Sequence, residues 1–279
     1  MWVGQQLADG LDFWGFLGSL ILGGIILGIY TGLLGYVGAK TGLSLDLLSQ
    51  RAFGEKGSYL QSAMTSFTPI GWFGVGSFVS GGTATPNFAR FAKNGKAGAI
   101  TTVVAFFIGN SLMFFFGAVS SIFVGGNDIF EVMVRLNLFY LAVLVLGLNI
   151  WTTNDNALYT AGLGLANIFH QRKKPMVLLS GIIGTVASVW LYYNFCGWLN
   201  ILNCTLPPVG MILVLAYFMN KEDFETDQPK LKTIDWFAVA GVILGAIVAN
   251  LLHWGIASIN GMVVAAVCYC VGQAVNKRK

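Results

Sequence analysis

Seven long runs of apolar residues constrain this chain more than any other feature. They are Phe13–Val37, Gly98–Val124, Leu136–Phe169, Met176–Trp198, Leu199–Met219, Trp236–Trp254 and Gly255–Val275. A helix of about 20 apolar residues spans a lipid bilayer, so each run is long enough to cross one. Charged residues make up only 10% of the 279 residues, whereas soluble domains carry roughly 25%. The sequence therefore predicts an all-α polytopic membrane protein, with one transmembrane domain over residues 1–279.

Charge and cysteine content exclude several other classes. The net charge of +4 does not indicate nucleic-acid binding, because the basic residues lie in short loops between apolar runs, where orientation signals occur. The four cysteines do not have zinc-site spacing. We find no nucleotide-binding loop, catalytic triad or metal cluster in the sequence, so we do not expect an enzyme.

The basic loops predict the orientation. Three groups of basic residues lie next to apolar stretches. They are Arg172–Lys174, Lys277–Lys279 and the set Arg90, Lys93 and Lys96. The positive-inside rule places all three in the cytoplasm. The C-terminus is therefore expected on the cytoplasmic side of the membrane.

The same rule leads to a contradiction near the N-terminus. Lys40, Arg51 and Lys56 also look cytoplasmic, yet only the stretch Tyr59–Phe88 separates them from Arg90. One crossing cannot join two loops on the same side of a membrane. Either this stretch enters and returns as two half-helices, or an odd number of crossings is missing. Counting this stretch, we expect about eight membrane segments.

The first motif is a polar run inside apolar surroundings, Ser77–Phe91, which contains Gly81 and Gly82. Such a run breaks a helix, and broken helices build substrate sites at the membrane midplane of transporters. The alternative interpretation is a flexible loop that precedes a basic cytoplasmic turn.

The second motif lies within the run Leu136–Phe169. At 100° per residue, four polar side chains share one face of a helix: Asn149, Thr152, Thr153 and Asn156. Their amide and hydroxyl oxygens suit a small hard cation such as sodium. Alternatively they form hydrogen bonds between helices. Asp155 favours the functional interpretation, because an acid within a membrane span is costly.

These strings resemble cytosine permeases of the nucleobase–cation symporter family. Leu146–Tyr159 resembles the family's eighth helix, and Ser77–Thr83 with Phe88–Phe91 resembles the sixth. Gly71–Gly76 resembles the third helix, and Leu27–Gly42 resembles the second. The similarity covers nearly every residue from Met1 onward. It implies a LeuT-type fold of twelve helices, ten of them in two inverted repeats with broken helices.

Two departures from the family pattern indicate a shortened transporter. The chain begins in what resembles the middle of the family's first helix, and the third-helix string runs directly into the sixth at Gly76-Ser77. Residues 1–76 thus resemble family helices 1 (in part) to 3, and residues 77–279 resemble helices 6 to 12. Loss of the fourth and fifth helices, with adjoining pieces, makes two halves of different helices neighbours in sequence and accounts for the contradiction in the basic loops.

The resemblance also assigns site residues. For the nucleobase substrate they are Trp72, Ser77, Phe78, Ser80 and Asn154. Trp72 and Phe78 would stack on the two faces of the base, and Ser77 and Ser80 would bind its polar edge. The family has a glutamine where this chain has Pro69, so that contact is lost or the substrate differs.

A sodium ion is assigned to Asn149, Thr152 and Thr153, together with two backbone carbonyls from the missing part of the first helix. The cation site is therefore expected to be incomplete. The implied function is cytosine import by sodium symport across the cytoplasmic membrane, impaired by the internal deletion, with no cofactor beyond the coupling ion. The partners are the nucleobase and the lipid bilayer; the sequence does not indicate an oligomeric state. The alternative is a non-transporting remnant or a membrane-embedded interaction protein.

Overall fold

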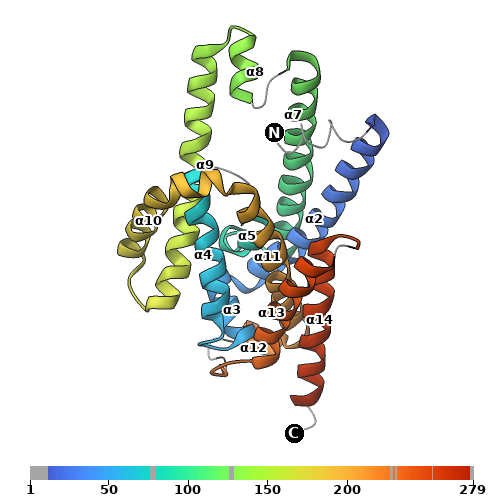
Figure 1. The fold of residues 1–279 in the computed structure, drawn as a ribbon. Helices are drawn as coiled ribbons and strands as arrows, with labels where there is room; N and C mark the ends of the chain where they lie inside the picture. The colour runs from blue at the N-terminus through green and yellow to red at the C-terminus, as the bar shows by residue number, and fades with distance from the viewer. Residues whose placement is uncertain are drawn as a thin grey trace. The chain divides into compact units, whose positions relative to one another are not determined.

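The computed structural model describes residues 12–75, 80–125, 129–226, 229, 231–252 and 254–276. These residues form helices and connecting turns, without a β-strand, which confirms the all-α prediction (Figure 1). The helices are α2 (Phe13–Thr41), α3 (Leu45–Phe53), α4 (Ser58–Val75), α5 (Ser80–Ala89), α6 (Gly95–Val104), the π-helix η1 (Ala105–Gly109), α7 (Asn110–Val124), α8 (Ile129–Arg135), α9 (Phe139–Phe169), α10 (Lys173–Tyr193), α11 (Phe195–Met219), α12 (Lys221–Glu225), α13 (Trp236–Leu251) and α14 (Ala257–Asn276).

Within the described residues, four helical segments are long and apolar enough to cross a membrane. They are Phe13–Thr41, Gly95–Val124, Gly197–Met219 and Ala257–Asn276. α13 is apolar but has only 16 residues, while α9 and α10 have 31 and 21 residues. All seven predicted runs fall on helices, and four of them meet both the length and the composition criteria.

One predicted boundary is wrong. We expected a turn between Trp198 and Leu199, but α10 ends at Tyr193 and α11 begins at Phe195. The side chain of Asn194 donates to the carbonyl of Trp190 at 2.9 Å. An asparagine that bonds the backbone competes with the helical hydrogen bonds, and α10 ends five residues before the predicted boundary.

The chain divides into two compact units. Unit 1 comprises residues 1–32 and 100–152, and unit 2 comprises residues 33–99 and 153–279. In unit 1, α2 packs against η1 through glycine. A Cβ added at Gly24 would lie 2.9 Å from Cδ2 of Phe107, so a larger residue at position 24 would push this ring away.

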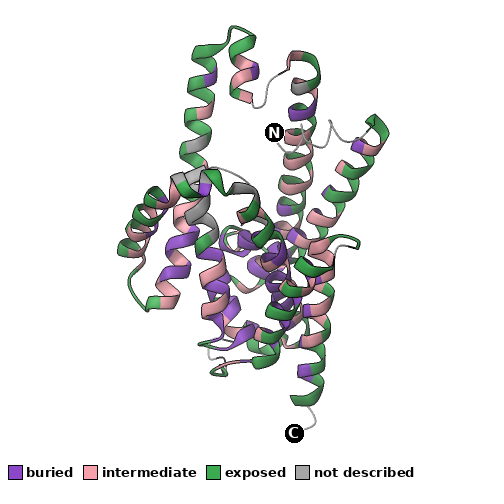
Figure 2. Cartoon of the chain, viewed as in Figure 1, coloured by how far each residue is buried: buried purple, intermediate pink, exposed green. Residues whose placement is uncertain are grey.

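In unit 2, α11, α13 and α14 pack closely through small residues. A Cβ at Gly245 on α13 would lie 2.7 Å from the carbonyl oxygen of Gly261 on α14 and 3.3 Å from Pro208 of α11. Small residues allow membrane helices to approach closely. Figure 2 shows that buried residues of this unit concentrate in α3, α4, α5 and α11.

The stretch Tyr59–Phe88 contains most of α4 and α5, and the start of α4 and the end of α5 both contact α3. Near the start of α4, Ser62 donates to Asp46 of α3 at 2.6 Å. Near the end of α5, Asn87 accepts from the backbone N–H of Leu45, also on α3, at 2.8 Å. The chain therefore leaves α3 along α4 and comes back to α3 along α5, as the first of the two interpretations of the basic loops requires.

Candidate functional site

The predicted cation ligands lie on α9, which is one uninterrupted helix. Thr152 donates its hydroxyl hydrogen to the carbonyls of Leu148 and Asn149, both at 3.1 Å. A hydroxyl that donates its hydrogen to the backbone keeps lone pairs available for a cation. Asn149 and Thr152 are exposed and Thr153 is half-buried. The oxygen chemistry of these residues fits a small hard cation.

Asn154, a predicted substrate residue, carries an unpaired acceptor. The residue is half-buried, and its Oδ1 atom is fully enclosed without a hydrogen-bond partner in the described structure. An unsatisfied buried polar atom costs about 1–3 kcal/mol. Such an atom therefore suggests that a ligand or a water molecule supplies the missing donor.

The other four predicted substrate residues fall on α4, α5 and the connection between them. Trp72 belongs to α4 and Ser80 begins α5, but the side chains of both lie outside the described residues. Ser77 and Phe78 lie outside them altogether. Trp72 and Ser80 are separated by only a few residues in the sequence.

A buried polar cluster was missed by the sequence analysis. We call it the Asp46 cluster, and its hydrogen-bonded members are Asp46, Gln50, Ser58, Ser62 and Asn167. Asn167 of α9 donates to Ser62 at 2.8 Å and to Ser58 at 3.1 Å, and it accepts from Gln50 at 2.6 Å. The cluster thus connects α3, α4 and the C-terminal part of α9 through side chains that are more than 100 residues apart in sequence.

Asp46 is the acid of this cluster. It lies on α3, whose nine residues are too short to cross a bilayer at 1.5 Å per residue. Burial raises the pKa of its carboxyl group from 3.8 to about 6, against the lowering effects of the Ser62 hydrogen bond and the positive charge of Arg90. Asp46 therefore keeps its proton to a higher pH than an exposed aspartate does.

Arg90 connects the cluster to Tyr159 of α9. Its Nη2 atom donates to the Tyr159 hydroxyl at 2.5 Å, and its charge acts on Asp46. Three enclosed atoms of this region have no partner in the described structure: Ser49 Oγ, Asn87 Nδ2 and Arg90 Nε. A single sequence does not indicate these contacts, because they depend on which helices become neighbours.

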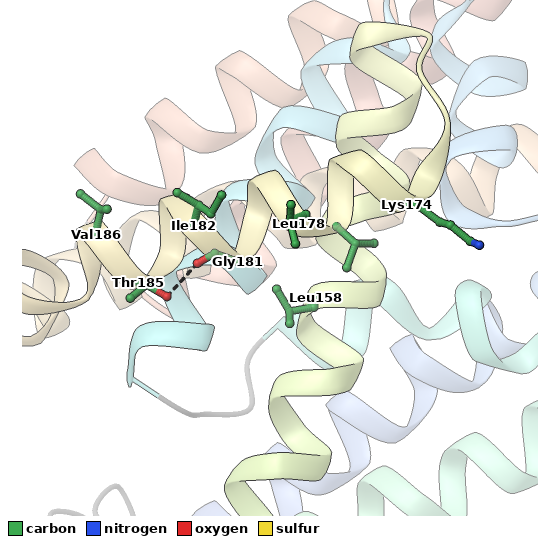
Figure 3. A pocket seen from close by; sticks show the side chains of 8 residues that line it. Leu158, Lys174, Leu178, Gly181, Ile182, Thr185 and Val186 are labelled. Carbon is green, nitrogen blue, oxygen red and sulfur yellow. Dashed lines mark hydrogen bonds between the residues drawn. The ribbon is translucent and has the colours of Figure 1, made fainter.

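A separate groove lies between α9 and α10 (Figure 3). It has a volume of about 490 Å³ and is lined by Leu158 of α9 and seven residues of α10 between Lys174 and Val186. Thr185, one of its few polar lining residues, already donates to Gly181 at 2.8 Å. None of the predicted site residues whose side chains the structure describes lines it. A nucleobase needs several hydrogen-bond partners, so this groove does not suit one.

Comparisons with known proteins agree with the motifs. The family of permeases for cytosine and purines, uracil, thiamine and allantoin matches in two pieces, residues 1–84 and 74–275. The cytosine permease of Escherichia coli K12 is 35% identical over 372 aligned positions, which include 100% of this chain and 88% of the relative. Cytosine permeases of E. coli O6:H1 and O157:H7 give the same values.

The alignment is longer than the chain. Of its 372 positions, at least 93 hold no residue of this chain, which has 279 residues. The two family matches also overlap at residues 74–84. The full coverage and the level of identity confirm the family resemblance, and the relatives are permeases rather than enzymes. This multi-pass membrane transport protein belongs to the family of permeases for cytosine and purines, uracil, thiamine and allantoin.

Proposed function

We propose that this chain is a sodium-coupled cytosine importer of the cytoplasmic membrane whose transport is impaired by a missing internal segment. The observation that carries the proposal is the two-piece family match meeting at residues 74–84, together with at least 93 aligned positions that this chain leaves empty. The residues before and after this point correspond to helices 1 (in part) to 3 and 6 to 12. The join lies between α4 and α5, at Gly76-Ser77.

The substrate site comprises Trp72, Ser77, Phe78, Ser80 and Asn154. Trp72 and Phe78 stack on the base, an arrangement that aromatic rings favour, and Ser77 and Ser80 bind its polar edge. The unpaired Oδ1 of Asn154 supports this assignment, because cytosine carries N–H donors on its ring and on its exocyclic amine. The bound base would then satisfy an atom that is otherwise buried at a cost.

The coupling site comprises Asn149, Thr152 and Thr153, with sodium as the ion. The bonds from Thr152 to its own helix support this role, because they fix the hydroxyl while its lone pairs stay available. Sodium supplies the driving force when it is bound, since one charge crossing 100 mV yields about 2.3 kcal/mol. In a symporter, the ion and the base shift the conformational equilibrium only through their different affinities for its states.

The orientation follows from the return of the chain to α3. Lys40, Arg51 and Lys56 then lie on the same side as Arg90, as the bonds of Asp46 and Asn87 to neighbouring helices support. The positive-inside rule places this side in the cytoplasm. The C-terminus is on the same side.

Transport is impaired because the alternating mechanism of such symporters requires two complete repeats that move against each other. The third helix of the family here continues into the sixth, so the first repeat is incomplete. A second candidate function is that of a non-transporting membrane-embedded protein. It is supported by the Asp46 cluster, whose hydrogen bonds join α3, α4 and α9.

A measurement of cytosine binding distinguishes the importer from the non-transporting protein. Radiolabelled cytosine would be measured on the purified chain with sodium or with choline as the cation. We expect saturable binding that needs sodium and is weakened at least tenfold by Thr153→Ala. Thr185→Ala on α10 is the matched control, because it makes the same substitution at a hydroxyl that bonds its own helix and lies outside the site. Absence of sodium-dependent binding to folded protein would favour the non-transporting alternative.

A further inference from the structure

We propose that the groove between α9 and α10 binds one anionic phospholipid, with its phosphate at Lys174 and one acyl chain along α10 toward Val186. This site is separate from the described nucleobase and cation residues Asn149, Thr152, Thr153 and Asn154, which do not line the groove. The inference holds whether or not the chain transports cytosine.

The groove has the form of a track along one helix. Its lining residues on α10 recur at intervals of three and four, from Lys174 through Leu178 and Ile182 to Val186, and therefore share one face. The twelve-residue interval from Lys174 to Val186 extends about 18 Å along the helix. One leaflet of the hydrocarbon core is about 15 Å thick. The track is thus long enough for a chain that starts at the headgroup level and ends near the midplane.

Its lining suits an acyl chain better than a rigid polar ligand. Leu178, Ile182 and Val186 are 69%, 56% and 79% exposed along the track. At Gly181 an added Cβ would meet only Leu158, at 3.5 Å, so this glycine leaves space between the two helices. Figure 3 shows these apolar side chains following α10 from Lys174.

The charged end of the track favours an anion. Arg172 and Lys174 are exposed beside the first turn of α10, while the ammonium group of Lys173 lies 3.5 Å from the ring centroid of Tyr159. The salt bridges of the described residues leave Arg172 and Lys174 without an acidic partner. The N-terminus of a helix repels cations, so these two residues are not stabilised by α10 itself. A lipid phosphate satisfies both the basic side chains and the helix terminus.

Native mass spectrometry of the purified full chain tests the site, with phosphatidylglycerol and phosphatidylcholine of identical acyl chains as probes. We expect tighter binding of phosphatidylglycerol. Lys174→Gln should weaken phosphatidylglycerol about fivefold, the effect of one basic residue near a membrane surface, and leave phosphatidylcholine unchanged. Lys96→Gln removes the same charge from another basic loop and should change neither. Gly181→Val should weaken both lipids, because it fills the track.

Equal binding of the two lipids by the unmodified chain would overturn the proposal, as would equal effects of Lys174→Gln and Lys96→Gln. A second copy of the chain is the competing occupant of the groove. Disulfide cross-linking of Ile182→Cys into dimers within the membrane, beyond the level of the unmodified chain, would also overturn it. Lys174→Gln alters only an exposed side chain, so the test does not depend on the folding of Gly181→Val.

Discussion

Two apolar segments of nearly equal hydropathy differ greatly in burial. Gly95–Val124 has a mean hydropathy of 1.9 and is 6% buried over its most apolar window, whereas Gly197–Met219 has a mean hydropathy of 1.8 and is 61% buried. Hydropathy therefore predicts that both segments enter the membrane but not which of them packs inside the protein. Burial instead follows the close contacts of small residues and the polar side chains that tie neighbouring helices together. Unit 2 contains most of these contacts among the described residues.

The largest expected effect concerns the buried acid of unit 2. The pKa of Asp46 is raised from 3.8 to about 6, so the folded state binds more protons than the unfolded state between these values. Stability must then fall as pH rises from about 4 to 6, by about 3 kcal/mol in total. Asp46→Asn should remove this loss, measured as the pH dependence of unfolding in detergent. Arg90 is the charged group that acts on Asp46 and opposes the effect of burial.

Asp223→Asn provides the matched control for Asp46→Asn. Asp223 is exposed on α12, so its replacement should preserve the pH dependence of the unmodified chain. If Asp46→Asn and the unmodified chain show the same slope between pH 4 and 6, the carboxyl group is not buried as the structure has it.

The next effect tests close packing. Gly245→Ala should destabilise the chain by about 1–3 kcal/mol, because the new Cβ would meet the backbone oxygen of Gly261 at 2.7 Å. Gly18→Ala in unit 1 meets nothing within 4 Å and should be neutral or stabilising by up to about 1 kcal/mol. Both changes in stability would be measured by thermal unfolding. Equal effects of the two substitutions would remove the distinction between the packed and the exposed helices.

A smaller effect is expected at Tyr159. Tyr159→Phe removes the acceptor of the hydrogen bond from Arg90 but keeps the ring against Lys173. Hydrogen bonds to charged groups contribute about 1.5–3 kcal/mol when buried, and this one is only partly buried, so we expect a loss of about 1 kcal/mol. Tyr140→Phe on the exposed part of α9 is the control, because Tyr140 is 87% exposed. A Tyr159→Phe variant as stable as the control would show that Arg90 is not held by this bond.

The smallest effect concerns an ion pair of unit 1. Glu131 and Arg135 form an i,i+4 pair on α8, with side chains that are 36% and 49% exposed. Exposed helix pairs contribute about 0.3–0.5 kcal/mol. Glu131→Gln should therefore lower stability by less than 0.5 kcal/mol, with a smaller effect at high salt, as measured by chemical unfolding. A loss above 1 kcal/mol would place this pair in a buried environment.

The sequence predicted the features that depend on local composition or on charge. The helical runs followed from apolar length. The basic residues on both sides of Tyr59–Phe88 left two interpretations open, a return of this stretch or missing crossings. The end of α10 was misplaced because the apolar run continues through Asn194, where the helix ends and the asparagine side chain bonds the carbonyl of Trp190.

The Asp46 cluster could not be predicted in the same way. Gln50 and Asn167 are 117 residues apart, and nothing in one sequence indicates that their helices become neighbours. For the site, the polar face of α9 and the role of Asn154 stay predictions, and the enclosed state of the Asn154 oxygen could not be predicted because it depends on the packing around it.

Sodium-dependent uptake of cytosine tests the central claim most directly. The chain would be compared with a chimera that carries the missing internal segment of the E. coli K12 cytosine permease between Gly76 and Ser77, in cells without a permease of their own. Membrane insertion of both would be measured in parallel. We predict that the chimera takes up cytosine only with sodium, and that the chain itself transports at least tenfold more slowly. Uptake by the unmodified chain at the rate of the chimera would contradict the account.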